Sequence, residues 1–85
     1  MNEARIDKWL WAARIFKTRS VAANACKNGR VTINGSNVKP ARIIKPNEII
    51  DVKKPPITYS FKVLQCIEQR VGAKLIPQIY ENVTD

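Results

Sequence analysis

The chain has 85 residues and a formal net charge of +8, with two cysteines and no histidine. A chain of this length forms one small domain with a thin core, which argues against a deep catalytic cleft. A composition without histidine and with only two cysteines excludes the usual Cys/His zinc patterns, so we expect no metal site and no cofactor.

The positive charge is concentrated in the first two thirds of the chain. Residues 1–54 hold twelve basic and four acidic side chains, whereas residues 55–85 hold three of each. Residues 8–47 include nine Lys or Arg and no Asp or Glu, so no acidic side chain neutralises this stretch locally. A long field of one sign favours a polyanionic partner.

The first predicted element is an amphipathic helix that starts near residue 5, after a loose end. Its apolar residues share one side at about 100° per residue, which predicts a core-facing stripe. They are Ile6, Trp9, Leu10, Ala13 and Phe16. Asp7 and Arg14 fall on the opposite side, and Trp11 also points away from the stripe. Trp11 is either a stacking surface for a base or a residue that packs under the C-terminal segment, and packing is the commoner fate of a large aromatic.

A second helix is predicted from residue 19 to residue 28, with Thr18 as its N-cap and Gly29 as its left-handed stop. Its predicted core stripe is formed by Val21, Ala22, Ala25 and Cys26. Another side is small, polar and cationic, and includes Arg19, Ser20, Asn24 and Lys27. Taken alone, this polar side could be an ordinary solvated helix face. The unpaired backbone amides at the helix N-terminus, beside Lys17 and Arg19, are however typical of a phosphate site.

Strands follow the two helices. Residues 30–35 alternate with period two and end in Asn34-Gly35, which predicts a hairpin whose short return strand points Val38 inward. Further strands are predicted at 48–52 and 57–63, separated by a joint at 53–56. Ile43 and Ile44 are both expected in the core, and residues 73–82 are expected to form one or two loose helical turns.

The remaining patterns exclude several kinds of activity. No acid/base pair accompanies the basic residues, and neither Cys26 nor Cys66 has a histidine to activate it, so we expect no enzyme. Both thiols are predicted to be buried and free, which we favour over a single disulfide. No apolar run has the length of a signal peptide or a membrane span, so we expect a soluble, cytoplasmic protein that binds no membrane.

Several motifs resemble the S4 domain, also called the alpha-L RNA-binding motif, over residues 5–52. These motifs are Arg5-Ile6-Asp7 with Leu10, Lys17-Thr18-Arg19-Ser20 with Ala22, Asn28-Gly29-Arg30-Val31, Ile33-Asn34-Gly35, Val38 and Lys39-Pro40. Within that superfamily, residues 7–14 (DKWLWAAR) with Lys17-Thr18-Arg19 resemble the bacterial family of ribosome-associated heat-shock proteins of fifteen kilodaltons. Asn47-Glu48 stands where the family usually has Gly-Asp, and the basic tail of longer members is missing.

The resemblance implies an α+β fold in which two N-terminal helices pack on a small, mostly antiparallel sheet. We divide the chain into an RNA-binding part (1–54) and a C-terminal strand with a short helical extension (55–85) packed on the same domain. The implied partner is structured RNA, either ribosomal RNA or tRNA, on the large ribosomal subunit, with a stress-related role in the rescue or recycling of stalled ribosomes. We expect a monomer. The implied RNA-binding residues are Arg5, Lys8, Arg14, Lys17, Thr18, Arg19, Ser20, Asn24, Lys27, Arg30 and Lys39.

Two other functions are compatible with the charge. The chain could be an accessory module of an RNA-modifying enzyme or a synthetase, although no catalytic portion accompanies it. It could also be a DNA-binding helix pair, although that function leaves the basic hairpin unused. Neither charge nor resemblance predicts which RNA sequence is bound, because Lys, Arg, Ser and Asn on a helix contact phosphates and 2′-hydroxyls more readily than base edges.

Overall fold

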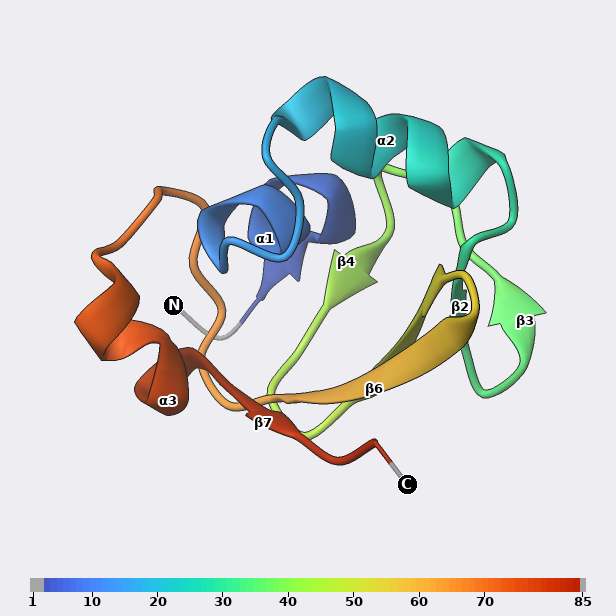
Figure 1. Ribbon diagram of the computed structural model, residues 1–85. Coiled ribbons are helices and arrows are strands. Elements are labelled where there is room, and N and C mark those ends of the chain that lie inside the picture. Colours follow the sequence, from blue (N-terminus) through green and yellow to red (C-terminus); the bar gives the residue numbers. More distant parts are fainter. Residues whose placement is uncertain (1–2, 85) are drawn as a thin grey trace.

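A computed structural model describes residues 3–84 of the protein. Two helices, α1 (Ile6–Ala12) and α2 (Arg19–Lys27), cover one face of an antiparallel sheet (Figure 1). The sheet has the strand order β3-β2-β5-β6-β7. This arrangement confirms the predicted α+β class. The strands are β2 (Val31–Ile33), β3 (Ser36–Asn37), β5 (Ile49–Lys54), β6 (Ile57–Val63) and β7 (Tyr80–Asn82).

A separate two-stranded ribbon holds the start of the described chain. It pairs β1 (Ala4–Arg5) with β4 (Ile43–Ile44), with Ala4 opposite Ile44. Residues 1–4 were expected to be a loose end, which was wrong for Ala4 because its side chain is buried against the core. Residues 1–2 lie outside the described residues. Ile43 was also misplaced and is 46% exposed, whereas Ile44 is fully buried. Neighbouring strand residues point to opposite faces, so only one of the two isoleucines can enter the core.

Helix α1 is shorter than its apolar pattern suggests. It ends at Ala12, and the backbone N–H groups of Ile15 and Phe16 both donate to the Leu10 carbonyl (3.0 and 3.2 Å). Arg14 adopts φ 65° in this turn. Phe16 therefore reaches the core from the linker that joins the two helices and not from the helix itself.

Helix α2 begins and ends as predicted. The Thr18 hydroxyl accepts a hydrogen bond from the Val21 N–H (3.0 Å), and Gly29 adopts φ +74° just beyond the last turn. Val21 is nevertheless 47% exposed and not part of the core. The buried stripe is narrow and consists of Ala22, Ala25 and Cys26, so Val21 lies at its margin.

The segment from 53 to 56 is part of a hairpin. Lys53 and Lys54 are the last residues of β5, and Pro55 and Pro56 form the turn into β6. Six residue pairs join β5 to β6, from Ile49 with Lys62 to Lys54 with Ile57. The division of the chain at residue 54 stays a prediction.

The C-terminal part forms the expected helical turns at 73–79 and then a strand that the sequence pattern did not predict. A 3₁₀ turn (Ala73–Leu75) leads into α3 (Ile76–Ile79), where Pro77 occupies an early position whose missing N–H costs the helix nothing. Residues 80–82 were expected to be helical, but they form β7 because their backbone pairs with residues 61–63 of β6. Among residues 3–84, no helix has the length and apolar character that crossing a bilayer requires.

Trp9 lies at the centre of the core. Its side chain is fully buried, its indole N–H donates to the Gln65 carbonyl (2.8 Å), and Tyr80 packs edge-on against its ring at 6.1 Å between centroids. Tyr80 in turn packs against Phe61 of β6 at 4.8 Å. The C-terminal segment therefore completes the environment of the first helix.

Candidate nucleic-acid interface

The start of α2 presents two cations around a helix N-terminus. Lys17, Arg19 and Ser20 are exposed there, and the Thr18 hydroxyl caps the Val21 N–H. The N–H groups of Arg19 and Ser20 lie in the same first turn, where the helix dipole contributes partial positive charge. Backbone donors, hydroxyl groups and two cations at one helix end suit a phosphate group.

The polar side of α2 continues toward the β2–β3 hairpin. Asn24 and Lys27 are exposed along the helix, and Arg30 is exposed where the chain enters β2. The side chain of Asn37 in β3 lies 3.5 Å from the position that a Cβ on Gly29 would occupy. The hairpin therefore packs directly beside the end of α2 (Figure 1).

Lys39 belongs to the segment that joins β3 to β4 and runs behind α2 in Figure 1. Its side chain is exposed. The same segment reaches the start of α1, where the Asp7 N–H donates to the Pro40 carbonyl (3.2 Å). Lys39 thus extends the positive charge from the hairpin toward the first helix.

Two of the predicted contact residues are engaged in ion pairs within the protein. The Arg5 guanidinium lies 3.0 Å from the carboxylate of Asp7, and Lys8 Nζ lies 3.9 Å from the carboxylate of Glu68. Asp7 was expected on the solvent side of α1, but it is only 5% exposed. Its carboxylate can be buried because it accepts hydrogen bonds from the Arg5 guanidinium and from the Lys8 N–H (2.7 Å). These pairs reduce the availability of Arg5 and Lys8 to a polyanion.

Trp11 and Arg14 lie against the segment around residues 70–71. The Arg70 guanidinium is 5.9 Å from the centre of the Trp11 ring, and Arg70 Nε donates to the Trp11 carbonyl (3.3 Å). Arg14 Nη1 donates to the Val71 carbonyl (3.4 Å). These contacts support packing under the C-terminal segment as the role of Trp11, in place of stacking on a base.

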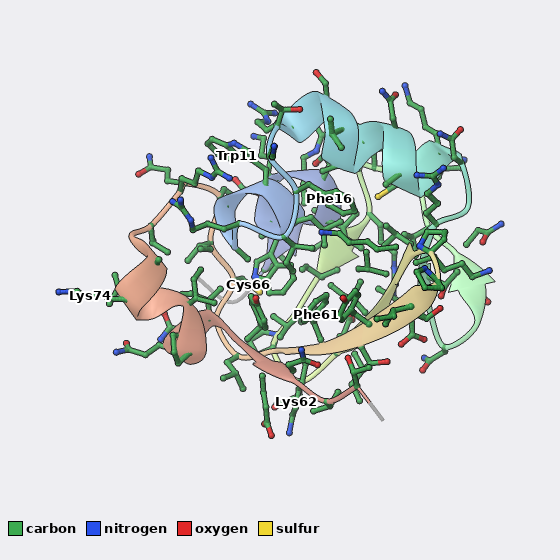
Figure 2. The ribbon with its side chains drawn as sticks, viewed as in Figure 1. Trp11, Phe16, Phe61, Lys62, Cys66 and Lys74 are labelled. Carbon is green, nitrogen blue, oxygen red and sulfur yellow. The ribbon has the colours of Figure 1, made fainter. Side chains whose placement is uncertain are left out.

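The remaining predicted residues are exposed and lie on α2, beside the two ends of α2 and on the β3–β4 segment. Within residues 3–84, none of the cations among them forms an ion pair. Nitrogen-tipped side chains extend from α2 away from the sheet in Figure 2. We call this set the basic surface: Lys17, Thr18, Arg19, Ser20, Asn24, Lys27, Arg30 and Lys39.

Lys54 is a cation near this region that the sequence analysis did not include. Its Nζ donates to the Ile15 carbonyl (2.6 Å) and lies 4.9 Å from the centre of the Phe16 ring. Ile50 and Val52 are both buried under the helices, and side chains two residues apart on a strand point to the same face. The same alternation would have placed Lys54 on the helix side of the sheet.

The thiols offer no catalytic chemistry. Cys26 and Cys66 are both free and buried, as predicted. Burial, assisted by the nearby negative charge of Asp7, raises the pKa of Cys26 to about 11, and burial also raises the pKa of Cys66. A neutral buried thiol is a poor nucleophile. Within residues 3–84, no cluster of three His, Cys, Asp or Glu side chains is placed to hold a metal ion.

Comparison with known proteins supports the fold and identifies the family. Heat shock protein 15 homolog of Aeromonas salmonicida is 40% identical over 80 residues, which cover 94% of this chain and 61% of that protein. The RQC P-site tRNA stabilizing factor of Listeria innocua is 30% identical over 76 residues, covering 89% of this chain and 82% of that protein. The chain thus spans about three fifths of the length of the heat shock relative.

A solved structure of Vibrio cholerae heat shock protein 15 matches this fold with a TM-score of 0.88 and 36% sequence identity, covering 95% of this chain and 82% of that one. The Vibrio protein is trimeric in that structure, which does not match our expectation of a monomer. The model of the S4 domain matches residues 4–50, a range that contains the whole basic surface. The chain therefore belongs to the S4 domain family.

Proposed function

We propose that the protein binds structured RNA through the basic surface and performs no catalysis itself. The observation that carries this proposal is the grouping of five exposed cations, unpaired within residues 3–84, around a capped helix start and a hairpin. Their hydroxyl and amide neighbours, Thr18, Ser20 and Asn24, can donate to phosphates and 2′-hydroxyl groups. Such a surface recognises the shape and backbone of folded RNA more than its sequence.

We further propose that the RNA is ribosomal RNA or tRNA on the large ribosomal subunit, and that binding serves the rescue of stalled ribosomes in the cytoplasm. The names of two groups of relatives support this: one is a heat shock protein and the other a P-site tRNA stabilizing factor. Co-sedimentation with separated ribosomal subunits tests the partner. Recovery with the large subunit is expected, and absence from both subunits would contradict the ribosomal part of the proposal.

A pair of single substitutions tests the surface itself. Arg19→Ala removes a cation at the start of α2 and should weaken RNA binding by about 1–2 kcal/mol, in the range of a lost charged hydrogen bond. Lys62→Ala removes the same charge from β6, and Figure 2 shows Lys62 on the side of the sheet away from α2. It should change the affinity little.

The comparison requires filter binding to ribosomal RNA, tRNA and duplex DNA at matched salt, with melting temperatures measured for both variants. Equal losses from two folded variants would show that net charge alone attracts the RNA. Equal affinity for duplex DNA and structured RNA would favour a general polyanion binder.

A further inference from the structure

A hollow of about 270 Å³ lies under the linker between α1 and α2, facing β6 and β7. Figure 2 shows Phe61 of β6 on the opposite side of this region from Phe16 of the linker. Two cations, three aromatic rings and one amide contribute to its wall. These residues are Arg14, Lys54, Tyr59, Phe61, Tyr80 and Asn82.

Aromatic rings form the floor of the hollow. Tyr59 and Phe61 lie nearly parallel, with 6.0 Å between ring centroids and 11° between ring planes, and Tyr80 meets Phe61 edge-on. Phe61 is buried, whereas Tyr59 is partly exposed. Tyr59 therefore presents an accessible ring that neighbouring aromatics hold in place. Aromatic rings on a sheet surface are common stacking platforms for unpaired bases.

The two cations lie at the rim. Lys54 uses one of its three donors on the Ile15 carbonyl, and Arg14 makes one long hydrogen bond to Val71 (3.4 Å), so both keep donors for a further acceptor. Arg14 also adopts φ 65° at the end of α1, a position at which glycine or asparagine is usual.

We propose that this hollow receives one unpaired nucleotide of the bound RNA, with its base against Tyr59 and its phosphate between Lys54 and Arg14. The Asn82 side-chain oxygen already accepts from the Thr84 N–H (3.0 Å) and hydroxyl (2.6 Å), so its NH2 group remains to donate to a base edge. The volume lies just below the range of about 300–1,000 Å³ typical of small-molecule sites, which suits a single flat group. No acidic side chain contributes to the wall, so nothing there repels a phosphate.

The hollow adjoins the basic surface through the linker, because Arg14 and Ile15 precede Lys17 and Thr18 in the same short segment. A folded RNA that covers α2 can therefore place an unpaired nucleotide at Tyr59 while it stays in contact with the basic surface. This inference rests on the proposed function and adds a preference for an unpaired nucleotide to it.

Fluorescence anisotropy with two labelled RNA hairpins tests the inference. One hairpin is fully paired, and the other has a single unpaired adenosine. The native protein should bind the second hairpin more tightly. Tyr59→Leu should weaken binding to the second hairpin by about tenfold, the scale of one lost base stack, and should leave binding to the paired hairpin unchanged within about twofold.

Adjacent lysines supply a matched control. Lys54→Gln should also weaken binding to the hairpin with the unpaired adenosine, whereas Lys53→Gln, one residue earlier on the opposite face of β5, should not. Both substitutions remove one charge from an exposed residue, so the comparison holds even if Tyr59→Leu fails to fold. A photoreactive thiouridine at the unpaired position should crosslink to Tyr59.

The outcomes distinguish the two proposals. If Tyr59→Leu and Lys54→Gln bind both hairpins as the native protein does, the hollow does not receive a nucleotide and the proposed RNA binding by the basic surface stands. If the native protein binds neither these hairpins nor ribosomal RNA, both proposals fail.

Discussion

Asp7 stabilises the start of α1 from a buried position. Its carboxylate accepts from Arg5 Nε (3.2 Å), Arg5 Nη2 (3.0 Å) and the Lys8 N–H (2.7 Å). Burial, assisted by the same negative charge, disfavours the thiolate of Cys26 and raises its pKa to about 11. One acidic residue thus orders the helix start and adds to the burial that keeps a core thiol neutral.

The raised pKa of Cys26 makes stability fall at alkaline pH. The unfolded thiol releases its proton near 9.0 and the folded one near 11, so this stabilisation is complete below about pH 9 and is lost as the pH rises toward 11. The free energy of unfolding, measured in urea across that window, should decrease. In Cys26→Ala the decrease should be smaller by roughly 1–2 kcal/mol.

Cys66 and Tyr80, whose pKa values burial also raises, act in the same direction and stay in the variant, so the difference between the two proteins isolates Cys26. Identical slopes would mean that Cys26 ionises normally in the folded state. Thiol reagents at neutral pH should label Cys26 slowly in the folded protein and rapidly in urea.

The sequence predicted only some of the residues that are buried in the two helices. Helical periodicity identified Ile6, Trp9 and Leu10, because large apolar residues at that spacing have only one stable location. It misplaced Asp7, since a carboxylate is buried only when specific donors surround it and periodicity says nothing about donors. It also misplaced Val21, because small neighbours on α2 made the contact stripe narrower than the apolar pattern.

At the scale of elements, α2 was predicted well because its signals are local. A capping threonine, a run without glycine or proline, and a terminal glycine each act within a few residues. The structure has the helix from Arg19 to Lys27 with the Thr18 cap in place. The helix that carries half of the basic surface therefore begins at a position that one side chain defines.

Removal of this cap should lower the stability of the protein. Thr18→Ala should reduce the free energy of unfolding by about 1 kcal/mol, because the Val21 N–H loses its acceptor. Thr18→Ser keeps the hydroxyl and should retain most of that stability. Urea unfolding followed by circular dichroism measures both. Equal stabilities of the alanine and serine variants would contradict a stabilising cap.

Short strands were predicted less well. β1 and β7 have two and three residues, and neither has an alternating pattern long enough to detect. Their conformation depends on partners distant in sequence, namely β4 for β1 and β6 for β7. The hollow beside Tyr59 was equally undetectable from sequence, because it exists only once β7 lies beside β6 and the linker crosses above them.

At the scale of the whole molecule, positive charge is concentrated on the basic surface. Its five cations lie on α2, beside the two ends of α2 and on the β3–β4 segment, and residues 8–47 contain no acidic side chain. The sheet strands β5, β6 and β7 carry both signs of charge, with three lysines as well as Asp51 and Glu81. That the basic surface binds a polyanion stays a prediction, and the charge pattern did not indicate that ion pairs engage Arg5 and Lys8.

The affinity for RNA should fall steeply with salt. Contact of the five free cations with phosphates releases counterions, so a plot of log affinity against log salt should have a slope of about −3 to −5. Lys27→Gln should make the slope less steep by about 1, and Lys62→Gln should leave it unchanged. Filter binding over a salt series measures each slope. A slope near zero would rule out phosphate contacts as the main source of affinity.

Residues far along the chain cover Trp9, and this affects how the protein is synthesised. The Trp9 indole N–H donates to the Gln65 carbonyl across 56 residues of sequence, and the Arg5 N–H donates to the Glu68 carboxylate across 63. Such contacts cannot form until both ends of the loop are available, and closing a long loop costs entropy. On a translating ribosome, the cationic segment therefore emerges before residues 65–80, which supply contacts to the core around Trp9. Until those residues leave the exit tunnel, the growing chain carries an uncovered tryptophan that is prone to aggregation.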